Sequence, residues 1–135
     1  MDAGMDPEIF TGIRSIGIQE KTRNRVNKLN YVFDLDGTLC TNTHGDYSKA
    51  EPLVERIQRV NKLFDEGNQI VILTARGMGS TNNNTELAKL KWEEFTKKQL
   101  SDWGVNYHKL FLGKPSGDLY VDDKAVSDLD FFIIN

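Results

Sequence analysis

The sequence predicts one α/β domain of three layers, with a parallel sheet lying between helices. Short apolar runs typical of buried strands alternate along the chain with longer segments whose apolar residues recur at helical spacing. Such an alternation joins parallel strands through right-handed helical crossovers. A chain of 135 residues is long enough for one hydrophobic core and short for two. We therefore expect a single three-layer α/β/α domain.

Composition narrows the class of protein. Hydrophobic residues make up 39% of the chain, which indicates a globular protein, and the net charge of −3 argues weakly against a nucleic-acid partner. A single cysteine excludes an internal disulfide and suits a reducing cytoplasm. No stretch approaches the roughly 18 apolar residues of a membrane span, and the N-terminus lacks a signal-peptide pattern. These features predict a soluble, cytoplasmic protein without a membrane partner.

The chain divides into an extension or leader at residues 1–28 and a catalytic domain at residues 29–135. The extension contains scattered isoleucines that could form a short strand or a docking segment. Residues 20–28 are polar and basic, so they read as a solvated face or linker, with a phosphate-attracting arm as the alternative. Nothing in the extension carries recognisable chemistry.

The first half of the domain is predicted as strand, loop, helix and strand. Residues 29–33 end in β-branched and aromatic side chains, as a buried strand does. A polar loop follows over residues 40–51, and Pro52 suits the first turn of a helix. Apolar residues then recur at helical spacing up to Asp65. Residues 70–73 form a continuous apolar run, which is typical of a buried parallel strand.

The second half continues the alternation and adds two further strands. We expect a Gly/Ser/Asn loop over residues 78–85, a helix over residues 87–100, a third strand over residues 107–112 and a fourth strand over residues 119–121. A short helix or turn from Ala125 and a last apolar segment at residues 131–134 close the chain. The predicted sheet thus has four parallel strands.

Polar side chains follow three of these strands directly. They are Asp34 and Asp36 after the first strand, Thr74 after the second, and Asp122 and Asp123 after the fourth, with Lys114 in the loop before the fourth. Taken singly, these residues would read as turn residues, helix caps or a surface lysine. Because parallel strands end at the same edge of a sheet, we expect them to converge there. Four carboxylates that admit an anionic ligand imply a hard cation, and oxygen ligands favour Mg²⁺.

The segment Asp-Leu-Asp-Gly-Thr-Leu at residues 34–39 resembles the nucleophile motif of the haloacid dehalogenase (HAD) superfamily, whose best-known members are phosphatases. The resemblance covers residues 30–126 and includes Thr74, Lys-Pro from Lys114, and the Asp122–Asp123 pair. It implies a Rossmann-like HAD domain and a Mg²⁺-dependent phosphatase that forms an aspartyl-phosphate. Since the second acid of the motif is present, the related dehalogenases are a poorer match.

The resemblance also implies a role for each matching residue. Asp34 would be the nucleophile, Asp36 the general acid and base, Thr74 a hydrogen-bond donor to the phosphoryl group, and Lys114 the cation that steadies this group. The implied metal ligands are Asp34, Asp36, Asp122 and Asp123.

Further residues are candidates for contact with the substrate. Backbone N–H groups of Leu35, Gly37 and Ala75 could cradle a phosphate. Arg76 could bind the substrate, or it could pair with a carboxylate. Tyr47 is read as a loop residue rather than a catalyst.

The spacing between the motifs leaves no room for a cap domain. Residues 40–73 and residues 75–113 each suffice for scaffold elements alone. A capless site is open, covered by loops, or closed by another subunit, so a homo-oligomer that closes the site is a possible partner arrangement.

The substrate class rests on a weaker likeness. Thr-Ala-Arg-Gly-Met from Thr74, with the Lys114 and Asp122 motifs, is similar to small bacterial phosphatases assigned to capsule or polysaccharide biosynthesis, which implies a sugar phosphate or small metabolite. The layout around Thr74 is also similar to the 3′-phosphatase domain of phage polynucleotide kinase, so a polynucleotide 3′-phosphatase or a nucleotide phosphatase is the alternative. The sequence is compatible with two further functions as well: a non-catalytic HAD-like binding or regulatory module, and a transferase whose acceptor is an alcohol instead of water.

Overall fold

The computed structural model describes residues 28–133. Residues 1–27 and residues 134–135 lie outside the described residues. Expectations for the N-terminal extension, and for the end of the last apolar segment, therefore stay predictions.

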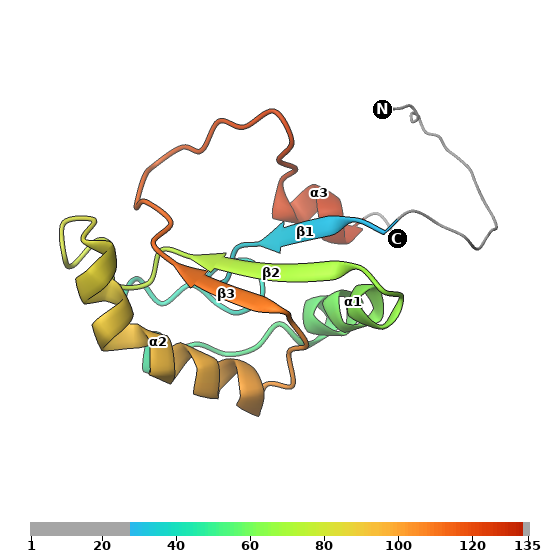
Figure 1. Cartoon of the computed structure of the whole chain (residues 1–135), viewed down its shortest axis with the longest axis horizontal. Helices are drawn as coiled ribbons and strands as arrows, with labels where there is room; N and C mark the ends of the chain where they lie inside the picture. The colour runs from blue at the N-terminus through green and yellow to red at the C-terminus, as the bar shows by residue number, and fades with distance from the viewer. Residues whose placement is uncertain (1–27, 134–135) are drawn as a thin grey trace.

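Three parallel strands form the sheet, in the order in which they occur along the chain. They are β1 (Asn30–Phe33), β2 (Gln69–Thr74) and β3 (Lys109–Leu112), and β2 lies in the middle (Figure 1). In the register, Phe33 of β1 is opposite Ile72 of β2, and Ile72 is opposite Leu110 of β3. The predicted α/β class, its parallel sheet and the first three strands are confirmed.

A helix joins each pair of successive strands, as parallel pairing requires. Helix α1 (Val54–Asp65) begins just after Pro52 and ends before Gly67, which has a φ of +97°. Helix α2 (Thr85–Asp102) begins after Asn84, whose side chain accepts a hydrogen bond from the Leu87 N–H at 3.1 Å. A short 3-10 turn, η2 (Tyr47–Lys49), interrupts the loop before α1. Helix α3 (Asp128–Ile133) closes the described chain.

The hydrophobic core lies on one face of the sheet. Phe33, Ile70 and Ile72 point to this face and are buried against apolar residues of α1 and α2, among them Val60 and Leu100. Because side chains alternate along a strand, all the inward residues of β1 and β2 meet these helices. The alternation therefore assigns α1 and α2 to the same side of the sheet.

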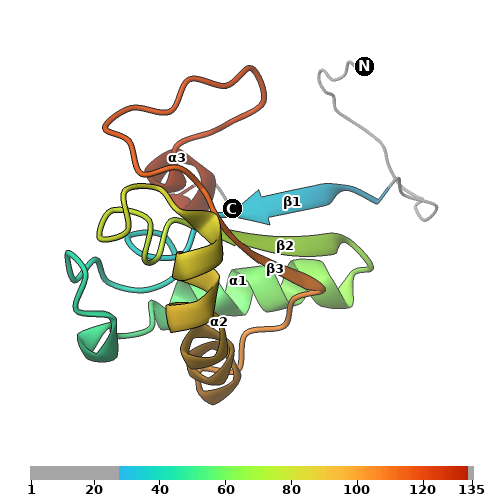
Figure 2. The same ribbon diagram turned by 60° about the vertical axis from the view of Figure 1, so that its left-hand side comes forward.

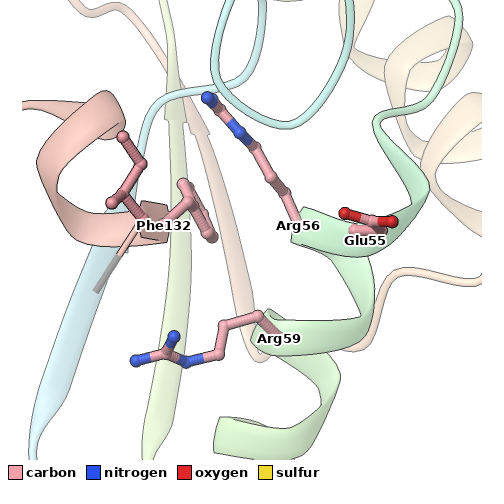
Figure 3. Close-up of a pocket in the computed structure, with 5 residues that line it drawn as sticks. Glu55, Arg56, Arg59 and Phe132 are labelled. Carbon is pink, nitrogen blue, oxygen red and sulfur yellow. The ribbon is translucent and has the colours of Figure 1, made fainter. Parts of the chain in front are cut away.

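Helix α3 covers the same face at its β1 side. The Phe131 and Phe132 rings lie 5.6 and 6.1 Å from the Phe33 ring, between centroids. The Arg56 guanidinium of α1 lies 4.8 Å from the centre of the Phe132 ring, and both side chains line a pocket between the two helices (Figure 3). Arg56 also pairs with Asp128 at 2.7 Å, which fastens the start of α3 to α1.

The opposite face of the sheet is open in the described part of the chain. Val32 and Phe111 point to this face and are 60% and 51% exposed, while Val71 and Leu73 between them are half-buried. Residues 28–133 thus form two layers, a sheet and the helices on one side of it. The third layer that the sequence predicts is not formed by these residues.

The predicted fourth strand at residues 119–121 is also absent from the described structure. This segment lies in a long loop, residues 113–127, which we call the arm, and Leu119 and Val121 are 81% and 91% exposed. A short apolar run predicts a strand only where neighbouring strands bury it, and no described strand does so here. As a result β1 is an edge strand among residues 28–133, paired on one side with β2.

The arm extends outward from the carboxyl end of β3 and returns to the body at α3, as two views of the ribbon show (Figures 1 and 2). No helix among residues 28–133 is long and apolar enough to cross a membrane.

Because the core lies on one face of the sheet, substitutions on the two faces should differ in their effect on stability. Replacing Ile72, which is 0% exposed, by Ala should lower the free energy of unfolding by about 2–5 kcal/mol, because a cavity opens in the core. Replacing Phe111, which is 51% exposed on the open face, should cost less despite its larger side chain. Urea denaturation of both variants measures the difference, and an equal or larger loss for Phe111→Ala would show that its face is covered.

Candidate active site

Asp34 is the first polar residue after β1, and its carboxylate faces the carboxyl edge of the sheet. The Thr38 hydroxyl donates to Asp34 Oδ2 at 3.0 Å, and the Lys114 ammonium lies 3.3 Å from Asp34 Oδ1. The Asp34 side chain is 34% exposed, whereas the Lys114 side chain is 21% exposed. An accessible carboxylate beside a cation can act as a nucleophile towards an anionic group.

Asp36 points the other way, into the protein, where it meets Arg76. The Arg76 Nε donates to Asp36 Oδ2 at 2.9 Å, and its Nη2 donates to Asp36 Oδ1 at 3.0 Å. The Arg76 side chain is 0% exposed and the Asp36 side chain 18%. Two parallel N–H···O bonds fix the orientation of both groups, which a lysine could not do. The geometry thus favours pairing with a carboxylate as the role of Arg76, over direct contact with a substrate.

Three other side chains surround the buried guanidinium. Arg76 Nη1 donates to the Thr96 hydroxyl of α2 at 3.2 Å, and Nη2 lies 3.8 Å from the Cys40 sulfur. The Arg76 guanidinium carbon also lies 4.8 Å from the centre of the Tyr47 ring. A buried cation is stable only when such partners replace water. The ion pair therefore depends on η2 and α2 as well as on the two strand ends.

The Lys114 loop is held by the end of β2. The Thr74 carbonyl accepts from the N–H groups of Gly113 and Lys114, both at 3.2 Å. The Thr74 hydroxyl accepts from the Arg76 N–H at 3.2 Å, and the residue is 1% exposed. Thr74 thus joins Lys114 to Asp34 on one side and Arg76 to Asp36 on the other.

The backbone after Asp34 makes a tight loop of its own. The Leu35 carbonyl accepts from the N–H groups of Thr38, Leu39 and Cys40, and the Gly37 N–H donates to the Cys40 carbonyl at 2.8 Å. Gly37 has a φ of +87°, which suits glycine. Since its N–H is used inside the loop, Gly37 is a poorer candidate for a phosphate cradle than the sequence suggests. For Leu35 and Ala75 this role stays a prediction.

Asp122 and Asp123 lie apart from the other candidate residues. Both are exposed and contact a neighbour on the arm: the Lys124 N–H donates to Asp122 at 2.8 Å, and the Lys124 ammonium lies 3.5 Å from Asp123. Within residues 28–133, no three His, Cys, Asp or Glu side chains are placed to share a metal ion. The structure brings together Asp34, Asp36, Thr74, Arg76 and Lys114, but not Asp122 and Asp123.

Within residues 28–133, the predicted magnesium ligands do not converge on one point, so the magnesium site stays a prediction. Both oxygens of Asp36 are engaged by Arg76, and Asp34 has Lys114 beside it. A hard dication requires several oxygen ligands that converge on one point. As the arm lies in residues 28–133, its acidic pair is not grouped with Asp34 or Asp36.

Two residues of the site have only a weak sequence signal. Tyr47, read from the sequence as a loop residue, covers the Arg76 guanidinium, and its hydroxyl accepts from the Gly77 N–H at 2.9 Å. Thr96 lies on the buried side of α2, where a polar residue breaks an apolar stripe. That break could have been noticed, because a buried hydroxyl needs a partner.

Cys40 is buried beside the ion pair, with its sulfur 3.4 Å from Asp36 Oδ1. Burial, together with the neighbouring Asp36 carboxylate, raises the pKa of the Cys40 thiol to about 12. A thiol of this kind is a weak donor rather than a nucleophile.

Comparison with known proteins finds a similar structure but no family. No family model and no curated protein matches the chain. A crystal structure of a structural-genomics target from Vibrio cholerae is similar, with a TM-score of 0.72 and 29% sequence identity, over 78% of this chain and 89% of that one. The likeness extends over most of both chains, and the description of that protein includes no activity.

The close packing of the loop that follows Arg76 can be tested by substitution at Gly77. A Cβ at this position would lie 2.7 Å from the Trp92 ring and 3.1 Å from the Ala88 backbone, at a φ of +78°. Gly104 has a similar φ of +72°, but a Cβ there meets nothing within 4 Å. Gly104→Ala should therefore lower the free energy of unfolding by about 1–2 kcal/mol, from backbone strain alone. Gly77→Ala should lower it by about 1–3 kcal/mol more, because the new methyl group overlaps its neighbours. Denaturant titration of both variants measures the difference. Equal losses would contradict the close packing under Gly77.

A second prediction concerns the Cys40 thiol. With a pKa of about 12, roughly one thiol in ten thousand is ionised at pH 8. The native protein should react very slowly with a disulfide reagent such as DTNB, and the guanidinium-unfolded protein should react at once. Because ionisation near pH 9.0 is then confined to the unfolded chain, the stability due to Cys40 is complete below that pH and falls as the pH rises towards 12. Fast labelling of the folded protein would contradict the burial.

Proposed function

We propose that this protein is a phosphatase of the HAD type, which hydrolyses a phosphate monoester through a covalent intermediate on Asp34. The proposal includes the fuller fold of that superfamily, with a third layer over the open sheet face. Sugar phosphates or related small metabolites are the proposed substrates, and the cytoplasm is the proposed setting.

A single observation carries the proposal. Asp34 stands at the carboxyl end of a parallel strand with its carboxylate one-third exposed, and the Lys114 ammonium lies 3.3 Å from it. Asp34 Oδ2 is held by Thr38 at 3.0 Å, which orients the carboxylate. In an open α/β sheet, this edge is where ligands bind. A phosphoryl group at this point would meet an oriented nucleophile and a positive charge together.

The proposed reaction has two steps. In the first, an Asp34 oxygen attacks phosphorus, the bond from phosphorus to the ester oxygen breaks, and Asp36 gives the leaving oxygen a proton. In the second, Asp36 takes a proton from water, the water oxygen attacks phosphorus, and inorganic phosphate leaves Asp34. Lys114 would balance charge on the phosphoryl oxygens in both steps.

Arg76 would act on this chemistry through Asp36. The two contacts at 2.9 and 3.0 Å hold the Asp36 carboxyl plane in one orientation. When Asp36 carries a proton, the protonated oxygen would give up its contact with Arg76 and turn towards the leaving group, while the other oxygen still accepts from Arg76. We therefore assign Arg76 a positioning role rather than a contact with the substrate.

Mg²⁺ is the proposed cofactor, and it would offset the negative charge that the substrate brings to a site rich in carboxylates. Because Asp122 and Asp123 lie away from Asp34 in a single copy, no step above is assigned to the metal. The same separation favours a second candidate function, a binding module without turnover.

The test is the release of inorganic phosphate from p-nitrophenyl phosphate and from a panel of sugar phosphates, nucleotides and 3′-phosphorylated oligonucleotides, with and without Mg²⁺. Asp34→Asn should lower kcat by at least about 10³-fold, because the nucleophile is lost. Asp36→Asn should lower kcat by about 10²–10⁴-fold for alkyl esters and by less for p-nitrophenyl phosphate, whose leaving group needs no proton.

Asp102→Asn is the matched control, since this acid is exposed at the end of α2 and pairs with Lys98. It should leave the rates unchanged. Activity that survives Asp34→Asn would refute the nucleophile assignment. Silence of the folded wild-type protein over the whole panel would favour the binding module.

A further inference from the structure

Arg56 connects α3 to the loop that carries Asp34. The Arg56 Nη1 donates to the Thr38 carbonyl at 3.0 Å and to Asp128 Oδ2 of α3 at 2.7 Å. The Arg56 side chain is 21% exposed, so these two contacts replace much of the water around its charged end. One side chain of α1 thus joins the loop after β1 to the last helix of the described chain.

The peptide unit between Thr38 and Leu39 is held on both of its sides. Its carbonyl accepts from Arg56, and its N–H, which belongs to Leu39, donates to the Leu35 carbonyl at 2.8 Å. Because a peptide unit is planar, contacts to both of its polar groups fix the direction in which the chain enters and leaves it. Arg56 therefore helps to fix the backbone of Thr38.

The Thr38 side chain continues this line of contacts to Asp34. Its hydroxyl donates to Asp34 Oδ2 at 3.0 Å. A hydroxyl can hold a carboxylate in one orientation only if its own backbone is fixed, since the rotamer of a threonine is set relative to that backbone. The contacts run from Asp128 to Arg56, from Arg56 to Thr38, and from Thr38 to Asp34.

Helix α3 holds Arg56 by packing as well as by charge. The Arg56 guanidinium lies 4.8 Å from the centre of the Phe132 ring, and Figure 3 shows the side chain extending from α1 beside this ring, with its charged end near the loop that follows β1. A planar guanidinium can lie against an aromatic ring while its N–H groups donate elsewhere. The orientation of Arg56 therefore depends on the packing of α3.

We propose that Arg56 is a positioning residue for Asp34, which acts through Thr38, and that α3 keeps Arg56 in place through Asp128. Arg56 touches none of the reacting atoms. Without it, the Asp34 carboxylate is free to turn, so that a smaller fraction of bound substrate faces an aligned nucleophile. The inference rests on the proposed function for its effect on the rate, but not for the link between α3 and the Asp34 loop.

Arg59 offers a matched control, because it also contacts α3. It lies one turn further along α1, and its guanidinium carbon is 5.2 Å from the centre of the Phe131 ring. Arg59→Met removes a cation that packs on α3, as Arg56→Met does, but it leaves the Thr38 carbonyl with its donor. A comparison of the two variants separates the positioning of Asp34 from the fastening of α3.

Steady-state kinetics on a phosphate ester that the wild type hydrolyses gives the first test. Arg56→Met should lower kcat by about 10–10²-fold, because a displacement of about 1 Å can cost that much, and should leave KM within about twofold. Arg56→Lys retains an N–H donor for the Thr38 carbonyl and should lose less. Arg59→Met should keep the wild-type kcat. A folded Arg56→Met variant with the wild-type kcat would overturn the proposal.

A double-mutant cycle with Thr38→Val tests the route. Thr38→Val removes the hydroxyl, and with it the last contact between Arg56 and Asp34. In this background, Arg56→Met should lower kcat by less than about twofold, because the interaction through which it acts is already lost. An equal loss of kcat in both backgrounds would show that Arg56 acts by another route, and would overturn the assignment.

Amide hydrogen exchange gives a readout that needs no turnover. Arg56→Met should raise the exchange rate of the Leu39 N–H by about tenfold relative to that of Ile72 in the central strand, because the peptide unit that Leu39 shares with Thr38 is loosened locally. Asp128→Ala should act in the same direction and by less. Arg59→Met should leave the Leu39 rate unchanged. Unchanged exchange at Leu39 in folded Arg56→Met would overturn the link.

The kinetic and exchange measurements separate this inference from the proposed function. A wild type without turnover defeats the proposed phosphatase, whereas exchange at Leu39 still decides whether Arg56 holds the Asp34 loop. An active wild type whose kcat and Leu39 exchange are both unaffected by Arg56→Met keeps the function and defeats the positioning role.

Discussion

The structure depends on one buried ion pair, between Asp36 and Arg76. The Arg76 side chain is 0% exposed. Removing one partner of a buried ion pair typically lowers the free energy of unfolding of a protein by about 3–5 kcal/mol. Its contacts join four separate parts of the chain: the loop after β1, the end of β2, the 3-10 turn at Tyr47, and α2 at Thr96. The requirement to satisfy one buried guanidinium therefore sets how these parts are placed.

The pair also explains how two acids in one short motif take different surroundings. Asp36 is drawn inward by Arg76, while Asp34, two positions earlier, is left a third exposed beside Lys114. Thr74 links the surroundings of the two acids. Its hydroxyl accepts a hydrogen bond from the Arg76 N–H, and its carbonyl accepts from the N–H groups of the Lys114 loop. A motif that is linear in the sequence thus becomes one fixed group and one accessible group.

The features that the sequence predicts correctly are those that the local pattern of apolar residues determines. The periods of apolar residues located β1, β2, β3 and both crossover helices, and the parallel sheet then brought Asp34, Thr74 and Lys114 to one edge. The partner of Arg76 was left open because burial depends on distant packing at Tyr47 and Thr96. The prediction of a strand at residues 119–121 was wrong for a similar reason, because an apolar run does not by itself determine which neighbouring strand will bury it.

The order of the strands has a consequence for how the protein is made. Because spatial order follows chain order, each new strand pairs with the strand synthesised just before it. The three strands described in residues 28–133, with α1 and α2, have all been made by Leu112, before the arm leaves the ribosome. Phe131 and Phe132 of α3 cover β1 afterwards, so synthesis delays the closure of this side of the core until α3 has been made.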